Sequence, residues 1–256
     1  MIIQTEEERA ILREGGKHLA SILKTLESEL KPGMNTRDIN LRAEALIAQY
    51  GDTPALKGYH PQFAERAYPS SICVSVNDEV VHGIPSENNI VLQDGDIVSL
   101  DLVIIHNGLF VDSALTAPVG EIDSATKRLL SATEEALLLG IRQARTGARM
   151  GDISSAIENK GYECGYGVVY DYGGHGVGNA VHEEPSVPNV GDPGRGIVLR
   201  EGMVLAIEPM FNEGSPEVVL EPDGYTIKTA DGKRSAHFEH TIIVGKDGAE
   251  ILTLRD

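Results

Sequence analysis

Two histidines lie close together in a glycine-rich part of the chain. The segment Tyr172–Pro185 carries His175 and His182, with four glycines between positions 173 and 178. Each glycine disfavours a helix interior by roughly 1 kcal/mol relative to alanine, so a shared helical face is not expected. In a straight strand the two side chains would point to opposite faces about 23 Å apart. The sequence therefore predicts a segment that folds back if both histidines serve one site, and otherwise a surface loop.

Asp101 and Asp112 flank the dipeptide Asn107-Gly108, which is a strong signal for a two-residue hairpin turn. Such a turn fixes the register, so Val103 should face Asp112 and the two aspartates should be diagonal neighbours on one face. Like charges about 7–8 Å apart on an apolar hairpin repel each other and are costly to desolvate. A cation between them would offset this cost, and a solvated acidic edge is the alternative.

Two glutamates lie in or beside apolar, strand-like segments. Glu208 follows residues 203–207 and precedes Pro209, while Glu239 lies within residues 236–244. A buried glutamate without a partner destabilises a fold by several kcal/mol. Four carboxylates and one glycine-flanked histidine form an oxygen-rich set, which suits two divalent ions better than a single zinc or a calcium cage.

The overall charge restricts the partners of the chain. Among 256 residues, 22 Lys and Arg oppose 39 Asp and Glu, which gives a formal net charge of −17 at pH 7. Direct contact with nucleic acid or an anionic membrane is therefore not expected. Residues 1–20 lack the apolar run of a signal peptide and no later segment is apolar enough to span a bilayer, so a cytoplasmic location is expected. Cys73 and Cys164 have no C-x-x-C spacing, and both are expected to be buried thiols.

Helical periodicity and end signals predict four helices. One begins after Thr5 and ends before Pro32-Gly33, and the others lie at about 36–50, 125–144 and 152–163. Strand-like segments are 71–76, 97–105, 109–113, 203–207 and 236–244. A possible repeat has a period of 114 residues: Gly33, Asp38, Ile39 and Gly51 recur as Gly147, Asp152, Ile153 and Gly165. The pattern predicts an internally duplicated α+β domain with two lobes, and chance alignment of glycines is the alternative.

Six motifs, in order along nearly the whole chain, resemble those of type I methionine aminopeptidases. They are Asn77–Pro85, the pair Asp101 and Asp112, Gly174–Gly178, His182–Pro185, Ile207–Met210 and Phe238–Thr241. The resemblance implies the pita-bread fold, an α+β architecture with a central mainly antiparallel sheet, two pairs of helices and two lobes related by a pseudo-twofold axis. It also implies a single catalytic domain over residues 1–256 with no N-terminal extension.

The resemblance also implies a set of metal ligands. Asp101 would chelate one of two divalent metal ions, Asp112 and Glu239 would bridge both, and His175 with Glu208 would complete the second. Mn, Fe, Co and Zn are all compatible with such ligands, and the cellular supply of each metal decides among them. The paired ions would activate a water molecule for attack on a peptide carbonyl.

Three residues would act in catalysis by the same resemblance. Glu208 would shuttle a proton, in addition to binding metal. His182 would stabilise the oxygen that becomes negative in the tetrahedral intermediate. His82 would contact the substrate backbone and help the leaving amine.

The substrate-binding residues implied by the resemblance are His82, His182, Tyr59, Tyr68, Cys73 and Tyr225. Several positions depart from the family pattern. Tyr225 stands where tryptophan is frequent, Val181 where bacterial relatives often have phenylalanine, and Val103 where threonine is frequent. The segment from Tyr59 to Tyr68 is also longer than in the family. These changes alter the pocket wall, so the resemblance implies hydrolysis more firmly than selectivity for methionine.

The expected activity is removal of the initiator methionine from nascent proteins whose second residue is small. The partners would be nascent polypeptide N-termini at the ribosome, and the enzyme is expected to be a monomer. An X-Pro aminopeptidase or dipeptidase of the same fold is one alternative, but those enzymes usually have Pro-Gly after the late glutamate, where this chain has Pro209-Met210. A non-catalytic pita-bread binding protein is another, although such proteins usually lose metal ligands that are all present here.

Overall fold

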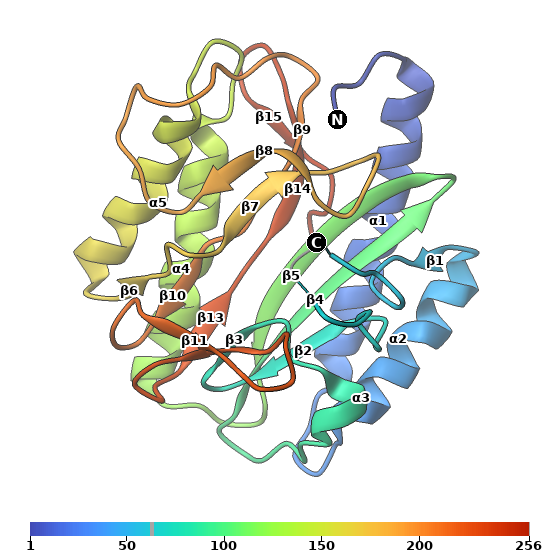
Figure 1. Ribbon diagram of the computed structural model, residues 1–256, viewed down its shortest axis with the longest axis vertical. Coiled ribbons are helices and arrows are strands. Elements are labelled where there is room, and N and C mark those ends of the chain that lie inside the picture. The colour runs from blue at the N-terminus through green and yellow to red at the C-terminus, as the bar shows by residue number, and fades with distance from the viewer. Residues whose placement is uncertain (62–63, 256) are drawn as a thin grey trace.

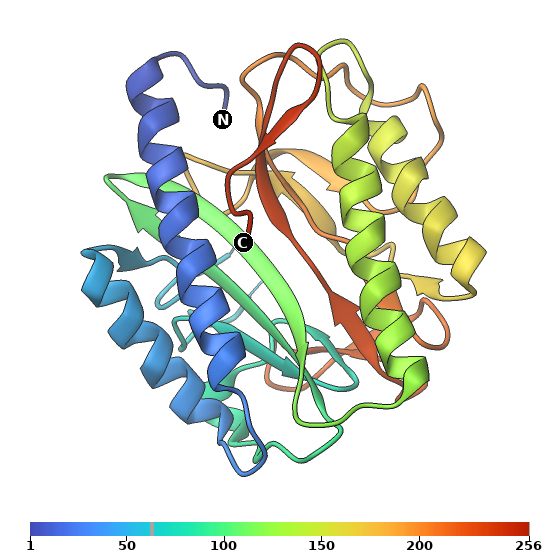
Figure 2. The ribbon, with the colours of Figure 1, turned by 180° about the vertical axis from the view of Figure 1, so that it is seen from behind.

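Four long helices lie on one face of the strands, in two pairs (Figure 1). The computed structural model describes residues 1–61 and 64–255. Figure 2, seen from behind, shows α1 beside α2 and α4 beside α5 in front of the strands. The helices are α1 (Glu6–Glu29), α2 (Thr36–Tyr50), α4 (Ser124–Gln143) and α5 (Met150–Cys164), and a single helical turn, α3, spans Pro85–Asn88.

The helix ends follow local sequence signals. The hydroxyl of Thr5 accepts the backbone N–H of Glu8 (3.1 Å), and the Glu8 carboxylate accepts the N–H of Thr5 (3.0 Å), which forms a capping box at the start of α1. Gly51 and Gly165 end α2 and α5 in the left-handed conformation. The four helices expected from the sequence are therefore confirmed.

The two helix pairs are built alike. Gly33 and Gly147, before the shorter helix of each pair, have φ of 86° and 89°. Gly51 and Gly165, which end those helices, have φ of 75° and 77°. Positions 114 residues apart thus occupy equivalent places, and the duplication expected from the sequence is present in the fold.

Within residues 1–61 and 64–255 the strands form four antiparallel sheets. One contains β1 (Thr53–Pro54), β2 (Cys73–Val76), β4 (Ile97–His106) and β5 (Leu109–Pro118). A five-stranded sheet contains β7 (Gly173–Gly176), β8 (Glu183–Pro188), β9 (Val204–Ile207), β14 (His240–Val244) and β15 (Ala249–Ile251). A third sheet contains β6 (Gly167–Val168), β10 (Met210–Asn212) and β13 (Ser235–His237). The fourth contains β3 (Glu79–Val81), β11 (Val218–Leu220) and β12 (Ile227–Thr229).

The register of the hairpin β4–β5 is the one predicted from its turn. Val103 pairs with Asp112, and Asp101 pairs with Ala114. Asn107 and Gly108 both have positive φ (46° and 88°), as a two-residue hairpin turn requires. β5 continues to Pro118, five residues beyond the predicted strand, because every residue from Leu109 onward finds a partner on β4.

Hydrogen bonds between buried groups join the two halves of the molecule beside β5. Thr241 Oγ1 on β14 donates to the Asp112 carbonyl (2.7 Å) and accepts from the Asp112 N–H (3.0 Å). The Ser113 hydroxyl donates to the Glu239 carbonyl (2.8 Å), and the Glu239 N–H donates to the Ala114 carbonyl (2.9 Å). Buried polar groups without such partners would be destabilising, so these bonds fix β5 against β14.

The glycine-rich stretch folds back, as the shared-site interpretation of the two histidines required. β7 and β8 pair antiparallel, with Gly174 opposite Val187, and β7 also pairs with β9.

The expected strand 236–244 is wrong as a single element. The chain leaves the sheet of β13 at Phe238-Glu239 and joins that of β14, because the Glu239 N–H bonds across to β5.

The two cysteines differ in burial. Cys73 is buried on β2, as expected. The expectation that Cys164 is buried is wrong, because it is the last residue of α5 and its side chain lies on the solvent side of that helix.

The main apolar core lies between the helices and the strands. Leu19, Ile22 and Leu23 of α1 are fully buried and pack in the same cluster as Leu100 and Leu102 of β4. No helix within the described residues is long and apolar enough to pass through a lipid bilayer.

Gly174→Ala tests the close packing that positions His175. A Cβ at residue 174 would overlap the carbonyl oxygen of Ala206 on β9, so β7 and β9 would have to move apart. We expect the free energy of unfolding to fall by about 1–3 kcal/mol in urea denaturation. Gly248→Ala is the matched control, because no atom lies within 4 Å of its added Cβ, and it should change stability by less than about 0.5 kcal/mol. Equal stability of the two variants would contradict this packing.

Candidate metal centre

The five residues expected to bind metal converge on one pocket, although they come from five places in the chain. Asp101 lies on β4, Asp112 on β5 and His175 on β7. Glu208 directly follows β9, and Glu239 lies in the break between β13 and β14. All five line the same cavity. The hairpin register places the two aspartates on one face, and the bonds beside β5 bring Glu239 to them.

The distances among these side chains match those between ligands of a shared ion. Nε2 of His175 lies 3.4 Å from Oε1 of Glu208 and 3.7 Å from Oδ2 of Asp112. Donor atoms of Asp112, His175 and Glu239 all lie within 4.8 Å of one another. Ligands about 2.0–2.2 Å from a tetrahedral ion are about 3.3–3.6 Å apart. The side chains therefore need little movement to bind one.

Burial raises the pKa values of three of the carboxyl groups. For Asp101 the pKa rises from 3.8 to about 6, chiefly through desolvation. The pKa values of Asp112 and Glu239 rise well above their usual range, first through burial and then through the charges of neighbouring carboxylates. Oδ1 of Asp112 and Oε1 of Glu239 are buried without a hydrogen-bond partner among the described residues. Divalent cations would satisfy these oxygens and relieve the repulsion, so the residues present fit a metal centre.

Two further histidines stand beside this set. The rings of His175 and His182 have centroids 4.5 Å apart, so the folded-back stretch does bring them to one site. The hydroxyl oxygen of Tyr59 lies 2.9 Å from Nδ1 of His182. Although part of His182 reaches solvent, desolvation lowers its pKa to about 3, and burial lowers the pKa of His82 to about 4. Both imidazoles are therefore neutral at pH 7.

His82 has an unusual backbone conformation. It follows β3 with φ of 63°, a left-handed value that is uncommon outside glycine and is found at functional sites. The ring lines both the cavity and the groove beside it.

His237 is a site residue that the sequence reasoning missed. Its Nε2 lies 3.5 Å from Oε2 of Glu208, its side chain is 1% exposed, and neither ring nitrogen has a hydrogen-bond partner in the described part of the chain. Its place two positions before Glu239 was a usable signal. Burial alone would raise the pKa of Glu208, but contacts with His237, His175 and His182 outweigh burial and lower it. Glu208 is therefore a carboxylate that can accept a proton.

The metal-ligand set lines a pocket, and His175 and Glu208 of this set also line a wider groove beside it. The pocket wall consists of apolar and aromatic side chains from several loops and strands: Leu56, Tyr59, Pro61, Tyr68, Cys73, Val103 and Tyr225. The groove runs past His82 and His182 and is lined by Val81, Tyr172, Glu183, Glu184 and Ser186. The pocket is closed enough for one side chain and the groove has room for an extended chain, so the site suits the end of a polypeptide.

All six residues expected to bind substrate line the pocket. The hydroxyl of Tyr68 donates to the Gly83 carbonyl (2.7 Å), and the hydroxyl of Tyr225 donates to the Arg66 carbonyl. Burial raises the pKa of the Cys73 thiol well above its usual value, so it remains protonated and packs as an apolar group. Val181 packs in one apolar cluster with Tyr68, Cys73 and Tyr225. Within the long Tyr59 to Tyr68 segment, residues 62–63 lie outside the described residues.

The sequence matches one family over most of its length and has relatives of similar size. The profile described as metallopeptidase family M24 matches residues 10–246. Methionine aminopeptidase 1 of Bacillus subtilis is 45% identical over 253 residues, which are 99% of each chain. A crystal structure of methionine aminopeptidase from Thermotoga maritima superposes with a TM-score of 0.93 at 43% identity, covering 99% of both chains.

A more distant neighbour bears on the fold alone. The prolidase from Pyrococcus furiosus superposes with a TM-score of 0.77 at 22% identity, covering all of this chain and 66% of the prolidase. The α+β pita-bread fold with two pairs of helices is thereby confirmed, because both kinds of neighbour share it with this chain.

Asp101→Asn tests the burial of negative charge in the metal-free protein. The folded pKa of Asp101 is about 6 against 3.8 ordinarily. A carboxyl group with a raised folded pKa stabilises the fold only while protonated, so stability is lost as pH rises from about 4 to 6. Asparagine has no such loss. Relative to wild type, the variant should gain on the order of 2–3 kcal/mol in free energy of unfolding between pH 4 and pH 7.

The measurement is urea denaturation in the presence of a chelator at several pH values. Asp171→Asn is the control, because Asp171 is exposed and should leave the pH profile unchanged. An identical pH profile for wild type and Asp101→Asn would contradict the burial of this charge.

Proposed function

The chain belongs to metallopeptidase family M24, and we propose that it works as a type I methionine aminopeptidase. It is a metal-dependent hydrolase that removes an N-terminal methionine from polypeptides whose second residue is small. One observation carries this function: the five-residue metal-ligand set lines the same pocket as a group of apolar and aromatic side chains. A first side chain seated in the pocket leaves the first peptide bond beside those ligands, where an aminopeptidase must cut.

Five residues would hold the metal. Asp101 would hold one divalent ion, Asp112 and Glu239 would be shared between two, and His175 with Glu208 would complete the second. The unpaired buried oxygens of Asp112 and Glu239 support bridging roles for these two residues. Ions held there supply Lewis acidity, which polarises a carbonyl group and acidifies water. The mixture of carboxylates and one imidazole supports an ion of the Mn, Fe, Co or Zn class.

His182 would stabilise the negative oxygen of the tetrahedral intermediate. A neutral imidazole donates from only one nitrogen, so the Tyr59 hydroxyl within 2.9 Å of Nδ1 decides which nitrogen that is. When Tyr59 donates to Nδ1, the hydrogen of the ring lies on Nε2 and can be directed at the carbonyl oxygen. The lowered pKa of His182 supports this role, because the ring stays neutral and keeps one fixed donor over the working pH range.

Glu208 and His82 would handle protons and the substrate backbone. The lowered pKa of Glu208 keeps it ionised and so free to take up a proton, and Nε2 of His237 lies 3.5 Å from its Oε2. His82 lines both pocket and groove, so it is suitably located to contact the substrate at the bond that breaks. A proton accepted by Glu208 would then pass to the leaving amine.

The pocket would select methionine through its shape and its apolar wall. Tyr59, Tyr68, Cys73 and Tyr225 offer aromatic faces and a protonated thiol, which suit a flexible thioether side chain. We further propose that the whole chain acts as one catalytic unit and works as a monomer. Its substrates would be nascent chains at the ribosome in the cytoplasm. The net charge of −17 supports recognition of the polypeptide rather than direct binding of nucleic acid or membrane.

Hydrolysis of short peptides tests the proposed activity. Peptides beginning Met-Ala and Met-Gly, incubated with Mn²⁺, Fe²⁺ or Co²⁺, should release free methionine. Peptides beginning Ala-Pro should not be cut. Cleavage of Ala-Pro in place of Met-Ala would assign the chain to the X-Pro peptidases. No cleavage of either peptide with any metal would indicate a non-catalytic binding protein.

His182→Ala separates oxyanion stabilisation from metal binding. Loss of an oxyanion donor should lower kcat by on the order of 10²-fold or more. Metal content, measured by elemental analysis, should remain that of wild type. Asp112→Asn is the contrasting variant, because loss of a bridging carboxylate should deplete the metal. Metal loss in His182→Ala would show that His182 is a ligand.

Tyr59→Phe tests how His182 is held. The change removes the hydroxyl that bonds Nδ1 but keeps the aromatic ring in the pocket wall. We expect kcat to fall by about tenfold, since one hydrogen bond of roughly 1–1.5 kcal/mol is lost. KM for Met-Ala peptides should remain nearly unchanged. A large rise in KM at constant kcat would instead indicate that the hydroxyl binds substrate.

A further inference from the structure

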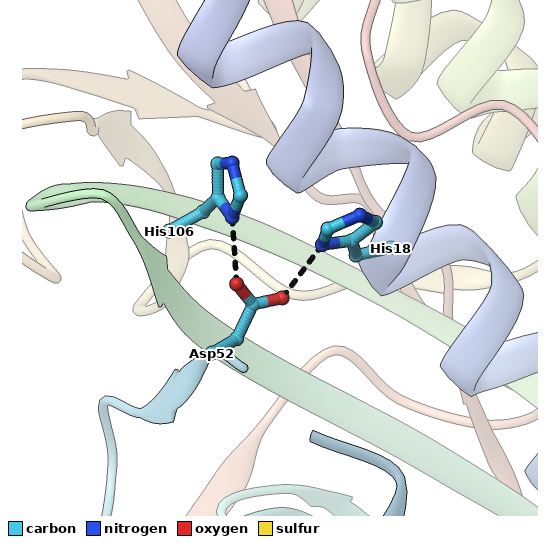
Figure 3. Close-up of side chains that lie close together, drawn as sticks. All are labelled: His18, Asp52 and His106. Carbon is cyan, nitrogen blue, oxygen red and sulfur yellow. Dashed lines mark hydrogen bonds and ion pairs between the residues drawn. The ribbon is translucent and has the colours of Figure 1, made fainter. Parts of the chain in front are cut away.

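A second cluster of metal-binding side chains lies outside the pocket, where α1, the turn after α2 and the end of β4 meet. Figure 3 shows His18, Asp52 and His106 pointing toward one another from these three segments. One donor atom of each lies within 4.8 Å of the other two. We propose that these three residues, the α1–β4 site, bind a divalent cation of the zinc type.

The distances within the α1–β4 site are slightly shorter than those between ligands of one ion. Nδ1 of His18 lies 2.9 Å from Oδ2 of Asp52, and Nδ1 of His106 lies 2.6 Å from Oδ1. Two ligands of a tetrahedral zinc ion are about 3.3–3.4 Å apart. The two histidines contact different oxygens of Asp52, and lengthening each contact by about 0.4–0.8 Å would bring it to this spacing.

The Asp52 carboxylate has no Lys or Arg partner within the described residues. Its side chain is 1% exposed, and its only ion-pair contacts within the described residues are with His18 and His106. An ionised carboxylate that is this buried is costly unless a positive charge is paired with it. A divalent cation between the three side chains would provide that charge, and the acidic chain as a whole attracts cations.

Outer groups are arranged as in known histidine–metal sites. When Nδ1 of His106 binds a cation, the ring hydrogen lies on Nε2. That nitrogen lies 3.4 Å from Oε2 of Glu14 and 3.1 Å from Nδ2 of Asn107. A histidine ligand commonly donates its second N–H to a carboxylate, which Glu14 supplies once the Asn107 amide turns its nitrogen away from the ring. Glu14 lies one helical turn before His18 on α1, and its side chain is 62% exposed. The cation can therefore approach from the Glu14 side.

The ligand types restrict which cations are suitable. Two imidazoles and one carboxylate match zinc and its neighbours in the first transition series, whereas calcium and magnesium prefer sites made of oxygen alone. The three protein ligands leave a fourth tetrahedral position, which water can fill. The cation would join α1 and the end of α2 to the turn of the β4–β5 hairpin, which carries Asp101 and Asp112 farther along its strands.

Zinc stoichiometry tests the α1–β4 site. Native mass spectrometry of the full chain in excess zinc should show one more ion in wild type than in His18→Gln, His106→Gln or Asp52→Asn. The catalytic ligands are the same in all four proteins, so their zinc cancels in the comparison. His60→Gln is the matched control, because His60 is exposed and its Nε2 contacts the Ala64 carbonyl rather than any of the three residues, and it should bind as much zinc as wild type. Equal zinc counts in wild type and all three variants would overturn the proposal and leave a hydrogen-bonded triad.

Two readouts complete the test. Zinc at about 100 times its Kd for the α1–β4 site should raise the Tm of wild type by about 5–10 °C more than that of His106→Gln. On wild type alone, zinc titration followed by ¹⁵N NMR of the imidazoles should shift the resonances of His18 and His106 together, with saturation. This second readout does not depend on any variant folding. Unshifted His18 and His106 resonances, beside a shifted His175, would overturn the proposal.

Discussion

Repulsion among buried carboxylates is the constraint on which the rest of this structure depends. Asp101, Asp112 and Glu239 lie together in a cavity, with Glu208 beside them. At an effective dielectric constant of 20, two unit charges 4 Å apart interact by about 4 kcal/mol. Without a cation, Asp101, Asp112 and Glu239 hold protons more tightly, because burial first and neighbouring carboxylates second raise their pKa values. Protonation does not satisfy every buried oxygen, because Oδ1 of Asp112 and Oε1 of Glu239 have no hydrogen-bond partner among the described residues.

Close packing and hydrogen bonds hold these groups together. Thr241 and Ser113 fix β5 against β14, so that an aspartate from one half of the chain meets a glutamate from the other. Glycine at positions 174 and 176 lets β7 approach the backbones of β9 and β8, which no larger residue would permit. The glycines around His175 are therefore a packing requirement of the metal centre, and the spacing of His175 and His182 follows from the hairpin that they allow.

Much of this site could be predicted from the sequence because its determinants are local. Asn107-Gly108 fixed the register that places Asp101 and Asp112 on one face, and the cap signals at Thr5 and Gly51 fixed helix ends. Other features depend on contacts between distant segments. The break at Phe238-Glu239 depends on a hydrogen bond to β5. The contact of His237 with Glu208 depends on the packing of two separate strands. His18, Asp52 and His106 meet because α1 docks on β4. No local pattern in the chain encodes those meetings.

A pocket with a largely apolar wall and a wider groove meet at the charged centre, so a chain bound in both would have its first peptide bond beside the metal ligands. The central claim is that divalent cations neutralise the clustered acids. Anomalous diffraction from a crystal grown with the native metal measures this directly. The account predicts two peaks about 3.5–4 Å apart, each within bonding distance of side chains among Asp101, Asp112, His175, Glu208 and Glu239. A map without a peak among these five side chains would contradict it.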